Sequence, residues 1–501
     1  MTASLSPLEY LIVHYRWVLV CFVLLPVSLV YDLFYYVRSY IIFKLNSAPH
    51  KHGDKVKHVQ RQVRQWISDG RPTQMCTARP GWQTISFRRP AYKSRLYCVS
   101  VNLMDVVRVD ETKQTVLVEP MVSMGQLTAL LLSSGWTIPV VPELDDLTVG
   151  GLVMGTGVES SSHKHGLIQH ICVSYELVLA DGSVVVCDKE NNADLFYAVP
   201  WSYGTLGFLT AVEFRIIPSK KYVKLDYKPV RSLDETVKVF SEAAARKEGN
   251  MFIEGLQFSL NEGVIMVGNM VDDYEPGKLN QIGKWHKPWF FMHVKSFLKK
   301  GEGTEYIPLR DYYHRHTRSI FWEIQDIVPF GNNILFRWLF GWMVPPKVSL
   351  LKLTQGETVK KLYENNHIIQ DMLVPMQELK KSIEVFHKEV EVYPLWLCPF
   401  KLTNEPGMVH SFSDKDELYV DIGVYGVPKV KNFHPVDTTR RLEEHVRNVK
   451  GYQMLYADSY MTKKEFEVMF DHTLYWKVRD QLNCKDAFPE VYEKCNKSAR
   501  I

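Results

Sequence analysis

Residues 148–160 contain four closely spaced glycines: Gly150, Gly151, Gly155 and Gly157. Glycine permits a positive φ and lets a ligand approach the backbone closely, because it has no Cβ. Successive backbone N–H groups in such turns can form a concave nest that binds phosphate or pyrophosphate. The valine and leucine residues between the glycines indicate that the segment packs on a core. We therefore expect a nucleotide phosphate site here, with a plain glycine-rich surface turn as the alternative.

Two common phosphate-binding motifs do not fit this segment. The Rossmann fingerprint places a third glycine where Ser160 follows Gly155-x-Gly157. The P-loop ends in Gly-Lys-Ser/Thr, which is missing here. A different kind of phosphate-binding segment is predicted, with Gly204, Thr205 and Gly207 as a secondary group of contacts. Its predicted cofactor-binding residues are Thr148, Val149, Gly150, Gly151, Leu152, Val153, Met154, Gly155, Thr156, Gly157, Val158, Glu159 and Ser160.

The densest polar cluster is residues 312–318, Tyr-Tyr-His-Arg-His-Thr-Arg. His314 and His316 would share a face in a strand but diverge in a helix. No acidic residue is placed to complete a metal site, so no metal is expected. The cluster is predicted to contact phosphate or to supply a proton donor, and an ordinary solvated basic face is the alternative.

The surrounding sequence predicts the elements that would position these residues. Short strands are expected over 101–110 and 114–120, followed by a helix over 124–134 that stops at Gly135. A hairpin over 173–186 should turn at Asp181-Gly182, with a further strand over 212–217. Amphipathic helices are predicted over 232–247 and 377–390, and a strand over 418–424.

This series of motifs resembles the FAD-binding domain of the vanillyl-alcohol-oxidase superfamily. A narrower resemblance is to the diminuto-like Δ24-sterol reductases, and it covers nearly the whole chain, membrane segment included. The runs that carry it are 142–151 (PELDDLTVGG), 159–164 (ESSSHK), 312–322 (YYHRHTRSIFW), 326–333 (DIVPFGNN) and 455–461 (LYADSYM).

The resemblance implies an α+β protein. It should have a two-subdomain FAD-binding domain of the vanillyl-alcohol-oxidase type, an α+β substrate or cap domain over the flavin, and an N-terminal membrane helix. The expected division is an anchor at 1–45, the FAD-binding domain at 46–219, the cap domain at 220–449, and a return to the FAD-binding domain at 450–501.

The resemblance also implies an activity, namely NADPH-driven, FAD-dependent reduction of the Δ24 double bond of sterol side chains, as in desmosterol to cholesterol. The alternatives are an oxygen-using sugar-lactone or alcohol oxidase of the same superfamily, or a non-catalytic sterol-binding scaffold. Many superfamily members have a first-loop histidine that can bond to the flavin. The corresponding residues 78–82 contain none, so FAD should be held without a covalent bond.

The proton donor should come from the second half of the chain, because the resemblance places the cap domain over the flavin. His314, Glu323 and Tyr456 are the predicted catalytic residues: all three lie in or beside the runs that resemble the sterol reductases. A donor must reach its acceptor by a hydrogen bond. The alternative for each is a purely structural buried hydrogen bond.

Composition limits the other possibilities. The net charge of +4 over 501 residues gives no argument for nucleic acid binding. The eight cysteines form no C-x-x-C pair and no His/Cys cluster, which argues against zinc, iron–sulfur and disulfide frameworks. A chain of this length should have two or three domains.

The N-terminal apolar stretch predicts membrane attachment. Residues 17–37 as a helix would span about 30 Å, and aromatic residues at both ends resemble interfacial belts. Basic residues follow it from Arg38 onward, so the catalytic body is expected on the cytosolic side of the endoplasmic reticulum, with the Golgi membrane as the alternative. Asp32 and Pro26 leave an in-plane helix open. Membrane lipid is an expected partner, and other sterol-pathway enzymes are candidate partners.

Overall fold

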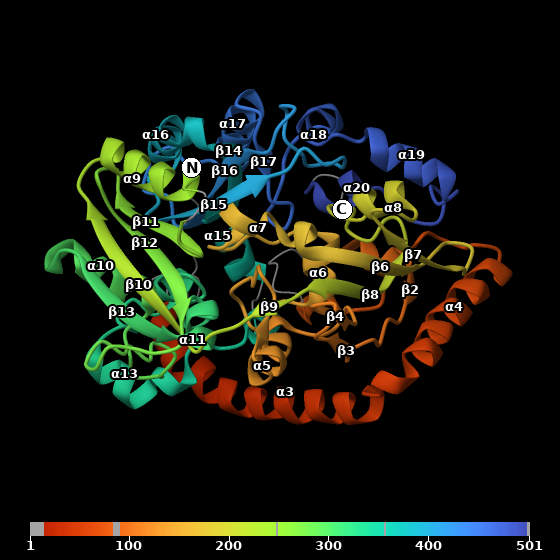
Figure 1. Cartoon of the computed structure of the whole chain (residues 1–501), viewed down its shortest axis with the longest axis horizontal. Helices are drawn as coiled ribbons and strands as arrows, with labels where there is room; N and C mark the ends of the chain where they lie inside the picture. The colour runs from red at the N-terminus through yellow and green to blue at the C-terminus, as the bar shows by residue number, and fades with distance from the viewer. Residues whose placement is uncertain (1–14, 84–90, 247–248, 355–356, 498–501) are drawn as a thin grey trace.

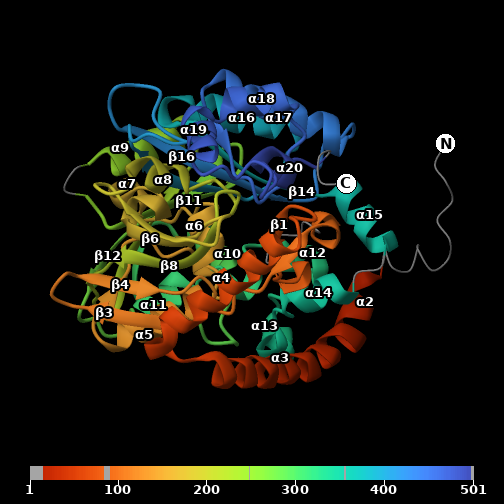
Figure 2. The same ribbon diagram turned by 90° about the vertical axis from the view of Figure 1, so that its right-hand side faces the viewer.

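The computed structural model describes residues 15–83, 91–246, 249–354 and 357–497. Helices surround two large sheets, one of five strands and one of eight, accompanied by two small two-stranded sheets (Figures 1 and 2). The mixture of helices with separate, mainly antiparallel sheets confirms the predicted α+β class.

The five-stranded sheet is antiparallel, with the order β3-β4-β8-β6-β7. The predicted hairpin joins β6 to β7, and Gly182 adopts a φ of +81° in its turn. The first predicted strand is shorter than expected, since residues 101–105 lie outside β3 and the pairing shifts register between Val106 and Arg108. The strands are β3 (Val106–Asp110), β4 (Thr115–Val118), β6 (Cys172–Val178), β7 (Val184–Asp188) and β8 (Phe208–Arg215).

Short elements complete this half of the molecule. Ser123 caps the predicted helix α5: its hydroxyl accepts from the Gln126 N–H, and the Gln126 side chain accepts from the Ser123 N–H. The small strands are β1 (Met75–Thr77) with β2 (Tyr97–Val99), and β5 (Trp136–Thr137) with β9 (Ile217–Pro218). The helices are α4 (His52–Ser68), α5 (Met124–Ser133), α6 (Val149–Met154), α7 (Ser162–His165) and α8 (Ala193–Ala198).

The eight-stranded sheet has the order β13-β10-β12-β11-β15-β16-β14-β17, and its neighbouring strands are antiparallel. The predicted strand over 418–424 is the central part of β16. The strands are β10 (Tyr222–Val230), β11 (Phe252–Ser259), β12 (Glu262–Val271), β13 (Gly303–Pro308), β14 (Ile368–Pro375), β15 (Leu395–Leu402), β16 (Glu417–Gly426) and β17 (Tyr452–Gln453).

The two faces of this sheet have different neighbours. Thr236 of α9 donates to Gln257 of β11 at 3.1 Å, so α9 covers the face on which Gln257 lies, together with α16 and α17 (Figure 1). Side chains alternate along a strand, so Glu254 lies on the opposite face. The helices of this half are α9 (Leu233–Ala245), α10 (Phe290–Lys300), α11 (Leu309–Tyr313), α12 (Glu323–Ile327), α13 (Ile334–Phe340), α14 (Val348–Thr354), α15 (Glu357–Asn366), α16 (Leu379–Glu389) and α17 (Pro435–Asn448).

The C-terminal residues contact both halves. β17 pairs with β14 at the edge of the eight-stranded sheet. The Met75 N–H donates to the Ala487 carbonyl at 2.7 Å, and Arg479 donates to the Thr205 carbonyl at 2.9 Å. The helices here are α18 (Lys463–Met469), α19 (Thr473–Gln481) and α20 (Val491–Cys495).

The N-terminal helix runs along one edge of the molecule (Figures 1 and 2). It consists of α2 (Arg16–Leu19), a π-helical turn (Val20–Leu24) and α3 (Leu25–Asn46), so it continues beyond the predicted end at residue 37. Trp17–Asn46 is long and apolar enough to cross a membrane. Only 17% of its most apolar 18-residue stretch is buried against the rest of the protein. It also contacts the body, since the Tyr31 hydroxyl donates to Ser349 Oγ at 2.9 Å.

Candidate active site

A large cavity, about 1270 Å³ in volume, is lined by both halves of the molecule. Pockets for one small ligand are typically about 300–1,000 Å³, so this cavity has room for a cofactor and a second molecule. Its walls are the glycine segment, the face of the eight-stranded sheet opposite α9, and the C-terminal half of α3. The α3 side chains in the wall are Tyr35, Arg38, Ser39, Ile42 and Phe43.

The predicted glycine segment divides between the cavity and the protein interior. Val149 and Val153 pack in the core, and Glu159 and Ser160 lie in a buried polar network. The other residues of the segment line the cavity: Thr148, Gly150, Gly151, Leu152, Met154, Gly155, Thr156, Gly157 and Val158. Of the secondary group, Gly204 and Gly207 line the cavity. Thr205 is buried and contacts Tyr475 Oη at 2.7 Å.

The glycines of this segment serve different purposes. The Gly150 N–H donates to the Pro120 carbonyl at 2.8 Å, so it is already used within the protein. A Cβ on Gly150 would lie 2.7 Å from Pro120 Cβ, and packing therefore demands a glycine there. A Cβ on Gly151 would come no closer than 3.3 Å to Thr148 Oγ1. Packing against Pro120 therefore explains the glycine at position 150, whereas the glycine at position 151 leaves the backbone accessible from the cavity.

Several cationic side chains line the cavity, among them Arg79, Lys93 and Lys494. Arg79 donates to Thr148 Oγ1 at 2.9 Å, while its buried Nε has no hydrogen-bond partner. Burial lowers the pKa of Lys494 to about 8 and also lowers the pKa of Lys93. Such donors suit a phosphorylated ligand. Sequence reasoning missed Lys93 and Lys494, because neither lies in a recognisable motif. Arg79 lies in the stretch 78–82 that corresponds to the first loop of the superfamily, but it was not predicted as a binding residue.

The structure places the three predicted catalytic residues differently. Glu323 and Tyr456 line the cavity, but His314 does not. His314 is buried, with Nε2 3.0 Å from Thr128 Oγ1 and Nδ1 2.9 Å from the Glu143 carbonyl, and burial lowers its pKa. Tyr456 is 39% exposed.

Glu323 accepts two hydrogen bonds at the cavity wall. The Tyr363 hydroxyl donates to Oε2 at 2.8 Å, and His367 Nε2 lies 2.8 Å from the same oxygen. The Tyr363 and His367 rings stack with centroids 4.2 Å apart. These contacts hold Glu323 in a fixed orientation. Within the described residues, no group of three or more His, Cys, Asp or Glu could hold a metal ion.

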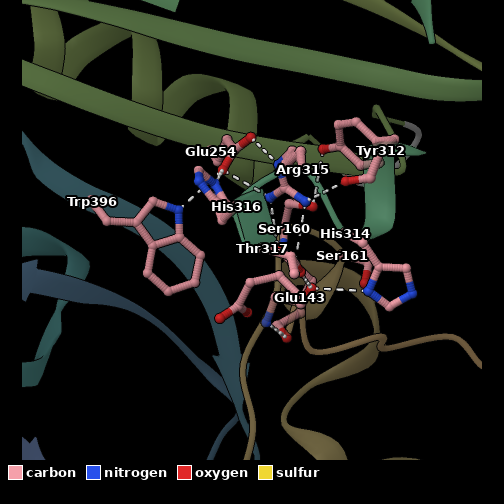
Figure 3. A network of polar contacts seen from close by, with 12 residues as sticks. Glu143, Ser160, Ser161, Glu254, Tyr312, His314, Arg315, His316, Thr317 and Trp396 are labelled. Atoms are coloured by element: carbon pink, nitrogen blue, oxygen red, sulfur yellow. Dashed lines mark hydrogen bonds and ion pairs between the residues drawn. The ribbon is translucent and has the colours of Figure 1, made fainter. Parts of the chain in front are cut away.

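A buried ion pair network joins the end of the glycine segment to the sheet (Figure 3). Arg315 donates to Glu159 Oε1 at 2.8 Å and to both carboxylate oxygens of Glu254, at 2.7 and 2.8 Å. The Trp396 indole N–H also donates to Glu254, at 3.0 Å. Burial alone would lower the pKa of Arg315, but the two glutamates raise it well above its ordinary value. Arg315 is therefore charged, and the network binds the two halves together.

The cavity-facing side of the sheet carries acidic groups that sequence reasoning missed. Asp421 of β16 and Glu143, which precedes the glycine segment, both line the cavity. Asp371 of β14 accepts a short hydrogen bond from the Tyr425 hydroxyl. Burial raises the pKa of Asp371 to about 7 and, with Glu159, that of Glu143 to about 8. The alternating pattern of β16 predicted a strand, but it could not show which face meets the cavity.

Comparison with known proteins supports a cofactor site at the glycine segment. Residues 76–188 match the family model described as "FAD binding domain". The matched range contains the whole glycine segment and Arg79. The cavity with its open glycine backbone and cationic wall therefore belongs to an FAD-binding protein.

Full-length relatives define the family. The chain is 61% identical to the Delta(24)-sterol reductase of Rattus norvegicus over 494 residues, covering 98% of this chain and 96% of the relative. It is 60% identical to that of Homo sapiens, over 99% of this chain and 96% of the relative. A more distant relative, L-gulonolactone oxidase of Mus musculus, is 23% identical over 77% of this chain and 82% of the relative. The chain belongs to the Δ24-sterol reductase family.

The ion pair network predicts a large effect on stability. Arg315→Met would leave Glu159 and Glu254 buried without their cation, and the free energy of unfolding should fall by about 3–5 kcal/mol. Denaturant unfolding measures the change. Arg231→Met is the matched control, because Arg231 pairs with Glu262 with both side chains about half exposed; it should cost less than about 1 kcal/mol. Equal losses in the two variants would show that the network does not hold the halves together.

Proposed function

We propose that this protein reduces the Δ24 double bond of a sterol side chain, using NADPH as reductant and FAD as the intermediate carrier. The observation that carries the proposal is a single cavity with two kinds of wall. One wall has the glycine backbone and cations suited to a dinucleotide. The other has the aromatic side chains of Phe321, Trp396 and Tyr425, which suit an apolar substrate. The full-length identity to Δ24-sterol reductases supports the same function.

The glycine segment is the proposed FAD contact. The members of 148–158 that line the cavity supply backbone and side-chain surface, with the pyrophosphate facing Arg79 and Lys494. Gly204 and Gly207 complete this wall, whereas Glu159 and Ser160 support the segment from behind. Bound FAD supplies a hydride donor and acceptor. No histidine lies within residues 78–82, so packing and hydrogen bonds hold the flavin without a covalent bond.

Gly151→Val tests this cofactor site. The valine side chain should fill the open approach above Gly151 and strip FAD from the purified protein, because a Cβ there meets little of the protein itself. Flavin absorbance per polypeptide is the measurement. Gly53→Val is the matched control, since a Cβ at exposed Gly53 has no neighbour within 4 Å. Acid denaturation of the unaltered protein should release free FAD. Full absorbance in Gly151→Val would contradict the assignment.

The chemistry requires an acid as well as a hydride source. An isolated trisubstituted alkene has no carbonyl to polarise it. Protonation at C24 places tertiary cation character at C25, where a hydride can then add. Phe321 lies with its ring centroid 5.0 Å from that of Tyr425 and 5.3 Å from that of Trp396. These aromatic faces can stabilise the developing cation in a water-poor cavity.

Two of the three predicted proton donors are placed to meet a substrate. Glu323 and Tyr456 line the cavity and stay candidates on that ground. His314 lies behind the wall, where its ring contacts the Glu143 carbonyl. We assign His314 a positioning role, in which it holds the backbone of Glu143 at the cavity edge.

Redox half-reactions separate the proposed function from its alternatives. Anaerobic NADPH should bleach the flavin absorbance, and desmosterol should then restore it while forming cholesterol. Reoxidation by oxygen with no response to desmosterol would instead support the oxygen-using sugar-lactone or alcohol oxidase. A flavin that neither NADPH nor desmosterol affects would support a non-catalytic sterol-binding scaffold. Stopped-flow absorbance with product analysis distinguishes these outcomes.

We further propose attachment to the endoplasmic reticulum membrane, or alternatively the Golgi, with the catalytic body in the cytosol. Support comes from the apolar α3 helix and a second apolar surface beside it. α13 and the turn after it lie next to α3 (Figures 1 and 2), and Trp17 contacts Phe330 with ring centroids 5.4 Å apart. The exposed apolar side chains of this second surface are Ile334, Leu335, Trp338, Leu339, Phe340 and Trp342. Its continuity with α3 favours a lipid bilayer as its occupant.

The α13 surface can be tested with a charged double variant. Leu335→Asp with Leu339→Asp should slow reduction of desmosterol in lipid vesicles severalfold, because charge opposes insertion of the apolar face. The rate with detergent-dispersed desmosterol should stay unchanged. Val468→Asp, at a 66% exposed position on α18, is the control on the opposite side of the molecule (Figure 1). Equal rates in vesicles for all three proteins would exclude membrane docking by α13.

Protease added to intact microsomes should digest the catalytic body, because we propose that it lies in the cytosol. Protection of the body from protease would show the opposite topology.

A further inference from the structure

One acidic side chain in the cavity wall has no hydrogen-bond partner among the residues that the structure describes. Asp421 is 1% exposed, lines the cavity, and neither of its carboxyl oxygens makes a hydrogen bond. A buried polar group without a partner costs about 1–3 kcal/mol, so such a residue is expensive for folding alone. Unpaired buried groups that a fold tolerates are candidates for chemistry with a ligand.

The pairing of the strands directs Asp421 to the cavity. On β16, Asp421, Gly423 and Tyr425 share one face, because side chains alternate along a strand. Gly423 pairs with Trp396 on β15 and with Asp371 on β14. Trp396 and Tyr425 also line the cavity. Asp421 therefore belongs to the same face as the aromatic wall.

Gly423 leaves space for the hydrogen bond that gives Asp371 a partner. A Cβ on Gly423 would lie 2.5 Å from the Tyr425 hydroxyl and 2.8 Å from Asp371 Oδ1. The missing side chain thus makes room for the hydrogen bond from Tyr425 to Asp371. Cys398 and Leu373 are the cross-strand neighbours of Asp421, and neither forms a hydrogen bond with its carboxyl group.

The surroundings of Asp421 favour its protonated form. Burial raises its pKa well above the ordinary value, and the nearby carboxyl groups of Asp371 and Glu143 raise it further. Two further groups on this face, Tyr425 and Cys398, also have pKa values raised by burial and are uncharged at neutral pH. Glu254, on the same face, is ionised and paired with Arg315. A neutral carboxylic acid can donate a proton inside an apolar cavity.

We propose that Asp421 is the general acid that protonates the substrate alkene, an inference that rests on the proposed function. The Asp421 O–H bond breaks as its proton bonds to C24 with the π electron pair. Bound FAD, with NADPH as the electron source, would supply the hydride that completes the saturated side chain at C25. The Asp421 carboxylate regains its proton from solvent. NADPH is oxidised and the alkene reduced by two electrons, and one proton is consumed.

Two substitutions at this position test the proposal. Asp421→Asn keeps the shape and removes the acidic proton, and Asp421→Leu also removes the unpaired polar group. Both variants should bind FAD fully and accept electrons from NADPH at the normal rate. Reoxidation of the reduced flavin by desmosterol should slow by about 10²–10⁴-fold, the usual contribution of a general acid. Glu323→Gln and Tyr456→Phe test the two competing candidates: if either slows this step more than Asp421→Asn does, that residue is the donor and the assignment of Asp421 is wrong.

Two measurements do not depend on turnover. Infrared spectroscopy should show the carbonyl stretch of a protonated carboxyl group that is missing in Asp421→Asn. Asp421→Leu should unfold at the same temperature as the unaltered protein or higher, because it removes a buried unpaired group. A purely structural Asp421 would instead make that variant less stable.

The outcomes separate this inference from the proposed function. Normal reoxidation of Asp421→Asn by desmosterol, or an ionised Asp421 in the infrared spectrum, would overturn the assignment. Failure of the unaltered protein to be reoxidised by desmosterol would overturn the proposed function and, with it, the role of Asp421. In that case the infrared and unfolding results would still show whether Asp421 is a protonated carboxylic acid or a group that stabilises the fold.

Discussion

Arg315 between Glu159 and Glu254 is the contact on which the arrangement of the cavity depends. A guanidinium group cannot be buried without compensation, and two carboxylates from different parts of the chain provide it. Glu159 ends the glycine segment, and Glu254 lies in the middle of the eight-stranded sheet. The network therefore fixes the distance between the cofactor wall and the aromatic wall. Each wall would otherwise be a separate surface on a separate sheet.

The glycine segment both lines the cavity and takes part in the buried ion pair network, with different residues in each role. Its first residues line the cavity, and its last two enter the buried network. Residue 159 can therefore not move without moving the backbone that lines the cavity. This coupling explains why polar residues with no access to the cavity stand directly beside the glycines. It also explains the polar run 312–318, most of whose members hold the two halves together rather than contact a ligand.

The sequence predicted local features well and non-local ones poorly. The glycine segment, the hairpin at Gly182 and the strand that became β16 follow from short-range composition and alternation. Residue type alone makes His314 a candidate donor, and nothing near it in the chain reveals its partners Thr128 and Glu143. Nothing in the sequence singles out Asp421, because the orientation of its strand depends on pairing with β14 and β15. Arg79 and Lys494 line the same cavity only because the C-terminal residues fold back against the first half.

The position of α3 determines which measure of substrate concentration governs the rate of this protein. Ile42 and Phe43 belong both to the apolar helix and to the cavity wall. When α3 lies in lipid, substrate enters the cavity from the bilayer and not from water. The relevant quantity is the mole fraction of sterol in the membrane. Adding inert lipid at a fixed amount of sterol dilutes the substrate, although the bulk concentration stays the same.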